Sequence, residues 1–180
     1  MTNGHGGGRI LSLGDLHPRL AADVFVAPGA TVVGDVEMAA GSSLWFNCVA
    51  RADVAPIRIG AGSNIQDGSI LHADHGFPTL IGADVLIGHI AIIHGCTIQD
   101  RGFVGMGAMI MNGAIVESDA MLAAGALLTP GKVARSRQLW AGRPAKYVRD
   151  LSEEDIAGMR KGTEHYRENA RRFLAASAGW

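Results

Sequence analysis

The stretch IQDRGFVGMGAMIMNGAIVESDAMLAAGALL, residues 98–128, places an aliphatic side chain at every sixth position. A small residue, glycine or alanine, follows four positions after most of them. A period of six matches neither the 3.6 residues of a helical turn nor the two-residue alternation of a single strand. It predicts a solenoid of short strands, three in each coil, in which every coil buries its aliphatic residues against the next. The repeating residues are Ile98, Val104, Ile110, Val116, Leu122 and Leu128.

The same period extends upstream and is interrupted twice. The steps 50–59 and 71–80 are longer than six residues and each contains a proline, which predicts loops inserted between repeats. Asp84, Ile90 and His75 stand where a small residue is expected, so the pattern has exceptions. The upstream aliphatic positions are Val26, Val32, Met38, Leu44, Ala50, Ile59, Ile65, Leu71, Leu80, Leu86 and Ile92.

Composition limits the class of protein. A chain of 180 residues is long enough for one domain with its own core and short for two. The net charge of −1, without a basic stripe, argues against nucleic acid and anionic membranes as partners. No run of 18 apolar residues occurs and the start does not resemble a signal peptide, which predicts a cytoplasmic protein. Cys48 and Cys96 fall on different faces of the predicted solenoid, so no disulfide is expected.

After Leu128 the six-residue period stops, and the chain ends in a segment with helical character. Ser152 is the expected N-cap, and Asp155 three residues later makes the pattern close to a capping box. We expect this helix to pack along the solenoid through an apolar stripe that includes Tyr166. The predicted organisation is a mobile tail over 1–11, a β-helix over 12–130, an extended connection over 131–150 and a helix over 151–180.

Histidines occur at stacked positions of the predicted coils. Because three strands complete a coil, every third repeat lies on the same face, about 4.8 Å higher. His72 and His94 then become vertical neighbours on one face, whereas His89 belongs to a different face. The count therefore predicts that His72 and His94 can share a metal ion while His89 of the same chain points elsewhere.

Other polar residues accompany each histidine face. Arg51 and Asp53 lie in the repeat below His72, and Gln66 and Asp67 lie in the repeat below the histidine of the other face. Two polar half-sites on adjacent faces can be joined when one face of a chain packs against the other face of its neighbour. Three such contacts close into a homotrimer with C3 symmetry, which predicts sites shared between chains.

Simpler interpretations remain for these side chains. An outward histidine in a solenoid is most often a solvated surface residue. His75 could also pair with His72, although two histidines on one loop are a weaker sign of metal binding.

At these residues the sequence resembles the gamma-class carbonic anhydrases and their hexapeptide-repeat relatives. The motifs that carry the resemblance are RAD at 51–53, NIQDGSILH at 64–72 and GHIAIIHGC at 88–96. The resemblance implies a left-handed parallel β-helix, an all-β solenoid, that forms a trimer with metal sites at its subunit interfaces. By resemblance, the zinc ligands are His72, His89 and His94, and the residues around the metal are Arg51, Asp53, Asn64, Gln66, Asp67 and Tyr166.

The resemblance also implies a reaction. Three neutral imidazoles leave Zn²⁺ with an open position for water, whose hydroxide form hydrates carbon dioxide to bicarbonate. Fe²⁺ or Co²⁺ could occupy the same ligands. The prototype of the family carries a glutamate in an acidic loop that moves protons. Here the loop after His72 reads ADHGFPT, without a glutamate, so either Asp74 or His75 replaces it or turnover is slow.

Two other functions are compatible with the sequence. Hexapeptide-repeat proteins include acyltransferases and thioesterases that act on acyl-CoA, and AGRPAK at 141–146 resembles their segment after the β-helix. A catalytically weak metal-binding assembly subunit of the same family is the other alternative. Metal content measured together with carbon dioxide hydration separates the three.

Overall fold

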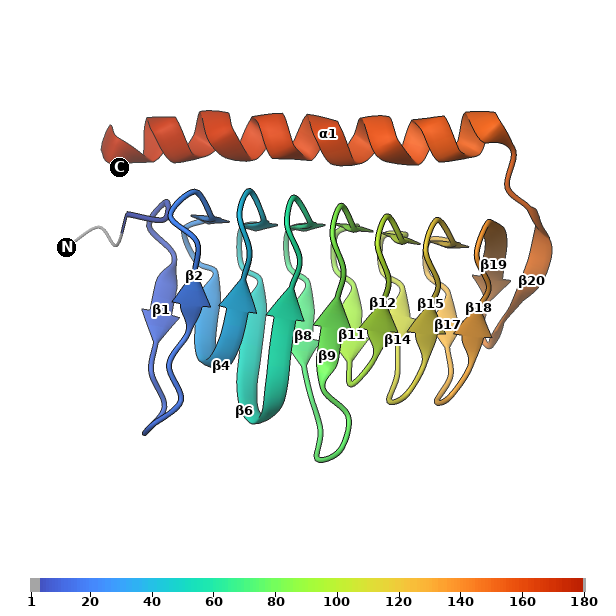
Figure 1. Cartoon of the computed structure of the whole chain (residues 1–180), viewed down its shortest axis with the longest axis horizontal. Coiled ribbons are helices and arrows are strands. Elements are labelled where there is room, and N and C mark those ends of the chain that lie inside the picture. The colour runs from blue at the N-terminus through green and yellow to red at the C-terminus, as the bar shows by residue number, and fades with distance from the viewer. Residues whose placement is uncertain (1–3, 180) are drawn as a thin grey trace.

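The computed structural model describes residues 4–179 and shows a parallel β-helix with one long helix lying along it (Figure 1). The strands form three faces, and within each face the strands of successive coils pair in parallel. The predicted all-β solenoid with a C-terminal α-helix is confirmed.

The strands of the three faces have the following bounds. The first face contains β1 (Arg9–Leu11), β8 (Ile70–His72), β11 (Ile92–His94), β14 (Met109–Ile110) and β17 (Leu127–Leu128). The second contains β2 (Arg19–Leu20), β9 (Thr79–Ile81), β12 (Thr97–Ile98), β15 (Ile115–Val116) and β18 (Val133–Ala134). β4 (Thr31–Met38) and β6 (Val49–Ile59) are long enough to contribute to both of these faces. The third contains β3 (Phe25–Val26), β5 (Ser43–Leu44), β7 (Asn64–Ile65), β10 (Leu86–Ile87), β13 (Phe103–Val104), β16 (Met121–Leu122) and β19 (Gln138–Gly142).

The aliphatic repeat forms the core, but its phase differs from the prediction in one coil. There the inward residues are Ile81, Ile87 and Ile93, all buried, whereas Leu80 and Ile92 are each 38% exposed. The loop after His72 shifts the pattern forward by one residue, and a five-residue step between positions 93 and 98 restores it. This shift also explains two of the exceptions in the pattern, because residues 84 and 90 are turn residues with φ of +56° and +60°.

The N-terminal segment is not the mobile tail that composition suggested. Strand β1 pairs with Thr31–Val33 of β4, and the backbone N–H of Gly8 donates to the carbonyl of Val26 at 2.9 Å. The prediction was wrong because the backbone of these residues forms its hydrogen bonds with the first coil. Residues 1–3 lie outside the described part of the chain.

The β-helix also continues past the predicted boundary at residue 130. Strands β18 and β19 extend the second and third faces, and β19 pairs in parallel with β16. Strand β20 (Ala145–Asp150) then returns antiparallel to β19 and ends the sheet. The period was lost after Leu128 because Ala134 and then Trp140, which pair with Val116 and Leu122, replace the larger aliphatic residues of the repeat.

Helix α1 (Glu153–Ala176), followed by the short 3₁₀ helix η1 (Ser177–Gly179), covers the third face, as Figure 1 shows. Its capping box is present, since Ser152 accepts from the N–H of Asp155 and the Asp155 carboxylate accepts from the N–H of Ser152. Gly162 allows close approach to the sheet, because a Cβ there would lie 3.2 Å from Leu86 Cδ1. Toward its end α1 packs Tyr166 and Phe173 into an aromatic cluster with Phe25, Trp45 and Phe46.

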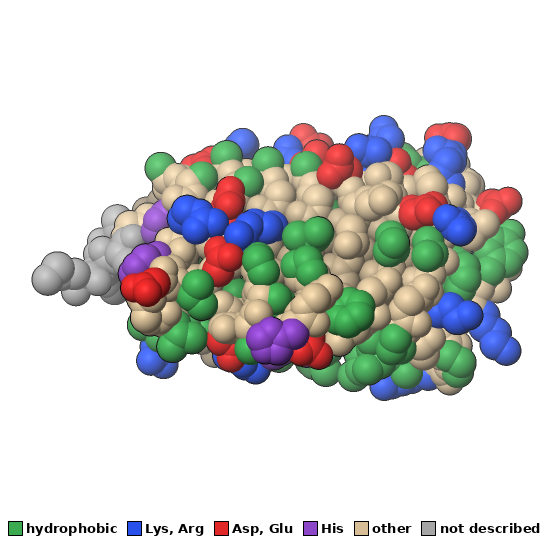
Figure 2. All heavy atoms as spheres, turned by 60° about the horizontal axis from the view of Figure 1, so that its bottom comes forward, with side chains coloured by type: hydrophobic (Ala, Val, Ile, Leu, Met, Phe, Trp, Pro, Cys, Tyr) green, Lys and Arg blue, Asp and Glu red, His purple; other side chains and the backbone are tan. Residues whose placement is uncertain are grey.

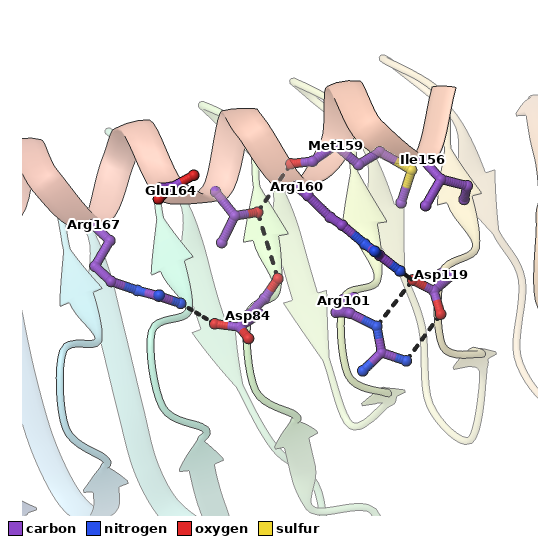
Figure 3. Close-up of a pocket in the computed structure, with 9 residues that line it drawn as sticks. Asp84, Arg101, Asp119, Ile156, Met159, Arg160, Glu164 and Arg167 are labelled. Atoms are coloured by element: carbon purple, nitrogen blue, oxygen red, sulfur yellow. Dashed lines mark hydrogen bonds and ion pairs between the residues drawn. The ribbon is translucent and has the colours of Figure 1, made fainter. Parts of the chain in front are cut away.

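Charged side chains also attach α1 to the solenoid. A groove of about 540 Å³ separates the helix from a row of turns (Figure 3). Arg101 donates to both carboxylate oxygens of Asp119 at 3.0 and 2.9 Å, and Arg160 of α1 approaches the same carboxylate at 3.8 Å. Arg167 of α1 forms an ion pair with Asp84. Arg160 and Arg167 of α1 therefore approach Asp119 and Asp84 of the turns, respectively.

The surface mixes both signs of charge. Figure 2 shows basic and acidic side chains interleaved over the N-terminal coils. On the second face Arg19 and Arg58 form ion pairs with Asp35 and Glu37. Among the described residues, no helix is long and apolar enough to cross a membrane.

Candidate metal centre

Two of the predicted ligands meet on the first face. Strands β8 and β11 pair in register, with Leu71 opposite Ile93 and His72 opposite His94. Each histidine directly follows a buried inward residue, so both side chains point outward at the same edge. Nδ1 of His72 lies 3.0 Å from Nε2 of His94. The predicted vertical pair is therefore present in a single chain.

Each of these imidazoles has a second polar partner on its other nitrogen. Nε2 of His72 lies 2.9 Å from Oδ1 of Asp53, and Nδ1 of His94 lies 2.6 Å from Oδ1 of Asn112. Such outer contacts orient histidine rings and select their tautomers. The hydroxyl of Thr79 adds a hydrogen bond of 2.5 Å to the carbonyl of His72 and holds the backbone beside it.

Arg51 occupies the predicted position below His72, its partner in the register of β6 and β8. It forms an ion pair with Asp53, whose other oxygen contacts His72. The pKa of the Asp53 carboxyl is lowered: burial acts to raise it, and hydrogen bonds from His72 and Arg51 outweigh that effect. Asp53 therefore links the arginine to the histidine pair.

His89 belongs to a separate group, in the turn between β10 and β11. Its Nδ1 lies 2.8 Å from Oδ2 of Asp67, directly below it, and its Nε2 lies 3.4 Å from the Tyr166 hydroxyl. Burial acts first to raise the pKa of Tyr166, and the charge of Asp67 adds to that effect. The aromatic cluster under α1 thus brings Tyr166 from the C-terminal helix to His89.

Gln66 and Asn64 lie beside this group and are almost fully buried. Nε2 of Gln66 donates to Oδ1 of Asn64 at 3.1 Å, and Nδ2 of Asn64 donates to the carbonyl of Val85 at 3.4 Å. Together with His89, Gln66 also borders a cavity of about 480 Å³. Its other lining side chains are apolar and include Leu86, Phe103, Met106 and Met121.

The two groups are not joined within one chain. Among residues 4–179, no three or more His, Cys, Asp or Glu side chains come together in a way that could hold a metal ion. None of the predicted site residues lines the groove under α1 that Figure 3 shows. One chain therefore presents two partial sites, on two edges of the β-helix.

Comparisons with known proteins agree with this architecture. No protein-family model matches the chain. The chain is 40% identical over 158 residues to a carbonic anhydrase of Geobacillus kaustophilus, covering 88% of this chain and 87% of the relative. It is 44% identical over 163 residues to gamma carbonic anhydrase 2, mitochondrial, of Arabidopsis thaliana, covering 87% of this chain and 59% of that protein.

The chain belongs to the gamma carbonic anhydrase family. It spans about 59–64% of the length of the Arabidopsis members. A solved Bacillus cereus structure described as an acetyltransferase superposes with a TM-score of 0.93 at 36% identity, over 94% of this chain and 98% of that one. The fold is accordingly the left-handed β-helix of hexapeptide-repeat proteins that the resemblance implied.

The histidine pair of this family member fits a metal ion. Because the Asp53 carboxylate accepts a hydrogen bond, a neutral His72 carries its proton on Nε2 and leaves Nδ1 bare. That bare nitrogen faces Nε2 of His94 at 3.0 Å. Zinc binds imidazole nitrogen at about 2.0–2.1 Å, so two nitrogens at this spacing can reach one ion.

Asn112 was missed by the sequence analysis. It lies in the turn after β14, one coil beyond His94. Because every third repeat stacks on the same face, the sequence also places Asn112 beside His94. The search for stacked residues had not included uncharged amides. Asp74 and His75 lie in the loop after His72, and Asp74 contacts Asn112. Cys48 and Cys96 are both free and buried, as expected.

Proposed function

We propose that this chain is a zinc-dependent gamma-class carbonic anhydrase that hydrates carbon dioxide reversibly to bicarbonate. The observation that carries the proposal is the pair of facing ring nitrogens of His72 and His94, with His89 on a neighbouring edge. Neutral imidazoles are common zinc ligands, and three of them leave a coordination position open.

The complete site requires two chains of a homotrimer. His72 and His94 of one chain would meet His89 of the next when one edge of the β-helix packs against another. Exposed apolar side chains beside both groups support such packing: Ile70 and Ile92 are outward on the first face, and Ile90 follows His89 with 72% of its surface exposed.

When bound, a zinc ion with these ligands supplies a water whose pKa falls to about 7, as in carbonic anhydrases generally. The remaining tasks belong to the chain. The side-chain NH₂ of Gln66 donates to Asn64. The side-chain carbonyl oxygen of Gln66 is then left to orient the reacting groups. The apolar cavity beside Gln66 and His89 suits carbon dioxide, which carries no charge. Arg51 would hold Asp53 and, across the interface, Asp67 of the neighbouring chain.

One preparation tests the proposal. We expect about one divalent metal ion per chain by elemental analysis, and carbon dioxide hydration that depends on it. Fe²⁺ or Co²⁺ in place of zinc would change the native metal but not the site. Protein that takes up none of the three ions would overturn the proposal, and a metal-loaded protein without hydration would point to the assembly or storage role.

A second candidate is acyl transfer from acyl-CoA, favoured by the structural likeness to the Bacillus cereus protein described as an acetyltransferase. An acyltransferase needs one histidine base and a groove for CoA, without three placed imidazoles. Acetyl-CoA turnover that is indifferent to chelation would favour it.

A further inference from the structure

His94 is the centre of a chain of side-chain hydrogen bonds that joins four successive coils. We propose that Asn112 and Asp74 are positioning residues that hold His94 in the tautomer with a bare Nε2. This inference rests on the proposed function, because it assigns a role in preparing a ligand of the proposed metal centre.

The hydrogen bonds lead from His94 through Asn112 to Asp74. Nδ1 of His94 lies 2.6 Å from Oδ1 of Asn112. Nδ2 of the same amide donates to Oδ2 of Asp74 at 3.1 Å. The other oxygen of Asp74 accepts from the backbone N–H of His75 at 2.8 Å, which anchors the carboxylate in its loop.

The chemistry of these groups leaves one arrangement. An ionised carboxylate only accepts hydrogen bonds, so the NH₂ end of the Asn112 amide must face Asp74. The carbonyl end then faces His94, and the ring nitrogen opposite a carbonyl must carry a hydrogen. A neutral imidazole has one N–H, so this hydrogen on Nδ1 leaves Nε2 bare.

The bare nitrogen points at the other half of the pair. Nε2 of His94 faces Nδ1 of His72 at 3.0 Å, and Asp53 orients the far side of His72. The two rings are therefore oriented from opposite sides by a carboxylate and by an amide. Outer contacts of this kind fix the ring and its tautomer before a metal arrives.

The fold leaves room for the Asn112 side chain. A Cβ on Gly95, which has φ of +56°, would lie 2.5 Å from Oδ1 of Asn112. A side chain at position 95 would thus displace the amide from His94. Phe77 of the loop also packs against this edge, because a Cβ on Gly113 would lie 3.2 Å from its ring. The loop that carries Asp74 is therefore packed beside the coil that carries Asn112.

Two variants test the contributions of Asn112 and Asp74 separately. Asn112→Leu keeps the approximate volume but removes the acceptor for His94. Asp74→Asn retains Asn112 but no longer requires its NH₂ end to face the loop, so the amide can turn. Gln99→Leu is the matched control, because Gln99 also joins successive coils, by accepting from the N–H of Ser118 at 3.1 Å, at a different corner.

The primary measurement is the nitrogen NMR spectrum of the histidine rings in metal-free protein, at a pH where they are neutral. We expect His94 to show a protonated Nδ1 and a bare Nε2 in the wild type and in Gln99→Leu. Asn112→Leu and Asp74→Asn should give mixed tautomers. In competition titrations, the zinc affinity of Asn112→Leu should fall on the order of ten- to a hundred-fold.

The outcomes distinguish this inference from the proposed function. An unchanged His94 spectrum in both variants overturns the positioning role, even where zinc binds well. A wild type that binds no zinc but loses the single tautomer in the variants would reject the metal site and retain the positioning role. If Asn112→Leu does not fold, Asp74→Asn decides the question alone, by the same spectrum.

Discussion

Nδ1 of His72 and Nε2 of His94 lie 3.0 Å apart, although the two residues are 22 positions apart in the chain. One coil of the β-helix separates them, and the parallel register of β8 and β11 aligns them. A hydrogen bond between these nitrogens needs a hydrogen on one of them, whereas a shared metal ion binds both in their bare form. The pair is therefore the part of the proposed metal centre that one chain supplies.

The other part comes from His89, and the division between chains can be tested by complementation. His89→Ala and His94→Ala should each be inactive as homotrimers. When the two are unfolded together in equal amounts and refolded, about a quarter of the interfaces of a head-to-tail ring combine the intact half of each variant. Carbon dioxide hydration should return to about that fraction of wild type. Mixed trimers without any recovered activity would place all three ligands on one chain.

Arg51→Ala should weaken both assembly and hydration. Asp53 loses its partner, and at the proposed interface the charge of Asp67 would also remain unpaired. Breaking a fully buried ion pair costs about 3–5 kcal/mol. Sedimentation at low protein concentration should show dissociation of this variant. Arg19→Ala is the control, because Arg19 pairs with Asp35 on the exposed second face. An Arg51→Ala trimer as tight as wild type would contradict this prediction.

Acid should weaken the ion pair between Arg101 and Asp119, which joins two successive turns beneath α1. Hydrogen bonds from Arg101 hold the pKa of Asp119 below its usual range, against the opposing effect of burial. A carboxyl whose pKa is lowered by folding stabilises the protein above its unfolded pKa, about 3.9, and this stabilisation disappears as the pH falls further. Asp119→Asn should lower the urea midpoint at pH 7, and its effect should shrink progressively as the pH is lowered from about 3.9 through the folded-state pKa. Asp15→Asn, at an exposed position, should leave the midpoint unchanged across this pH range.

His75 is a candidate for moving protons, because it is exposed in the loop beside the histidine pair. A neutral imidazole can accept a proton from the site and release it to buffer. His75→Ala should reduce turnover at low buffer concentration, and added imidazole should restore it. Equal dependence on buffer in the two proteins would exclude His75 from proton transfer.

The sequence alone determined the architecture and the faces on which the candidate site residues lie. A six-residue period can bury its aliphatic side chains only when strands stack in coils, so residues 98–128 were sufficient to predict the solenoid. Because every third repeat returns to the same face, the same period predicted that His72 and His94 stack and that His89 does not join them. Asp53 and Asp67 were also expected at the positions they occupy.

Only the tertiary structure decided features that depend on contacts between distant segments. In the coil that contains Ile87, the inward residues lie one position later than the period predicts. The conformation of the loop after His72 sets this shift, and the spacing in the sequence does not reveal it. The first strand and the last coil pair through their backbones with neighbouring coils, and Ala134 and Trp140 of the last coil also pack in or against the core. The amide of Asn112 faces His94 because Asp74 and Gly95, from two other coils, leave it that place. Periodicity reports which residues are buried, whereas the orientation of a polar side chain is set by the partners that folding brings to it.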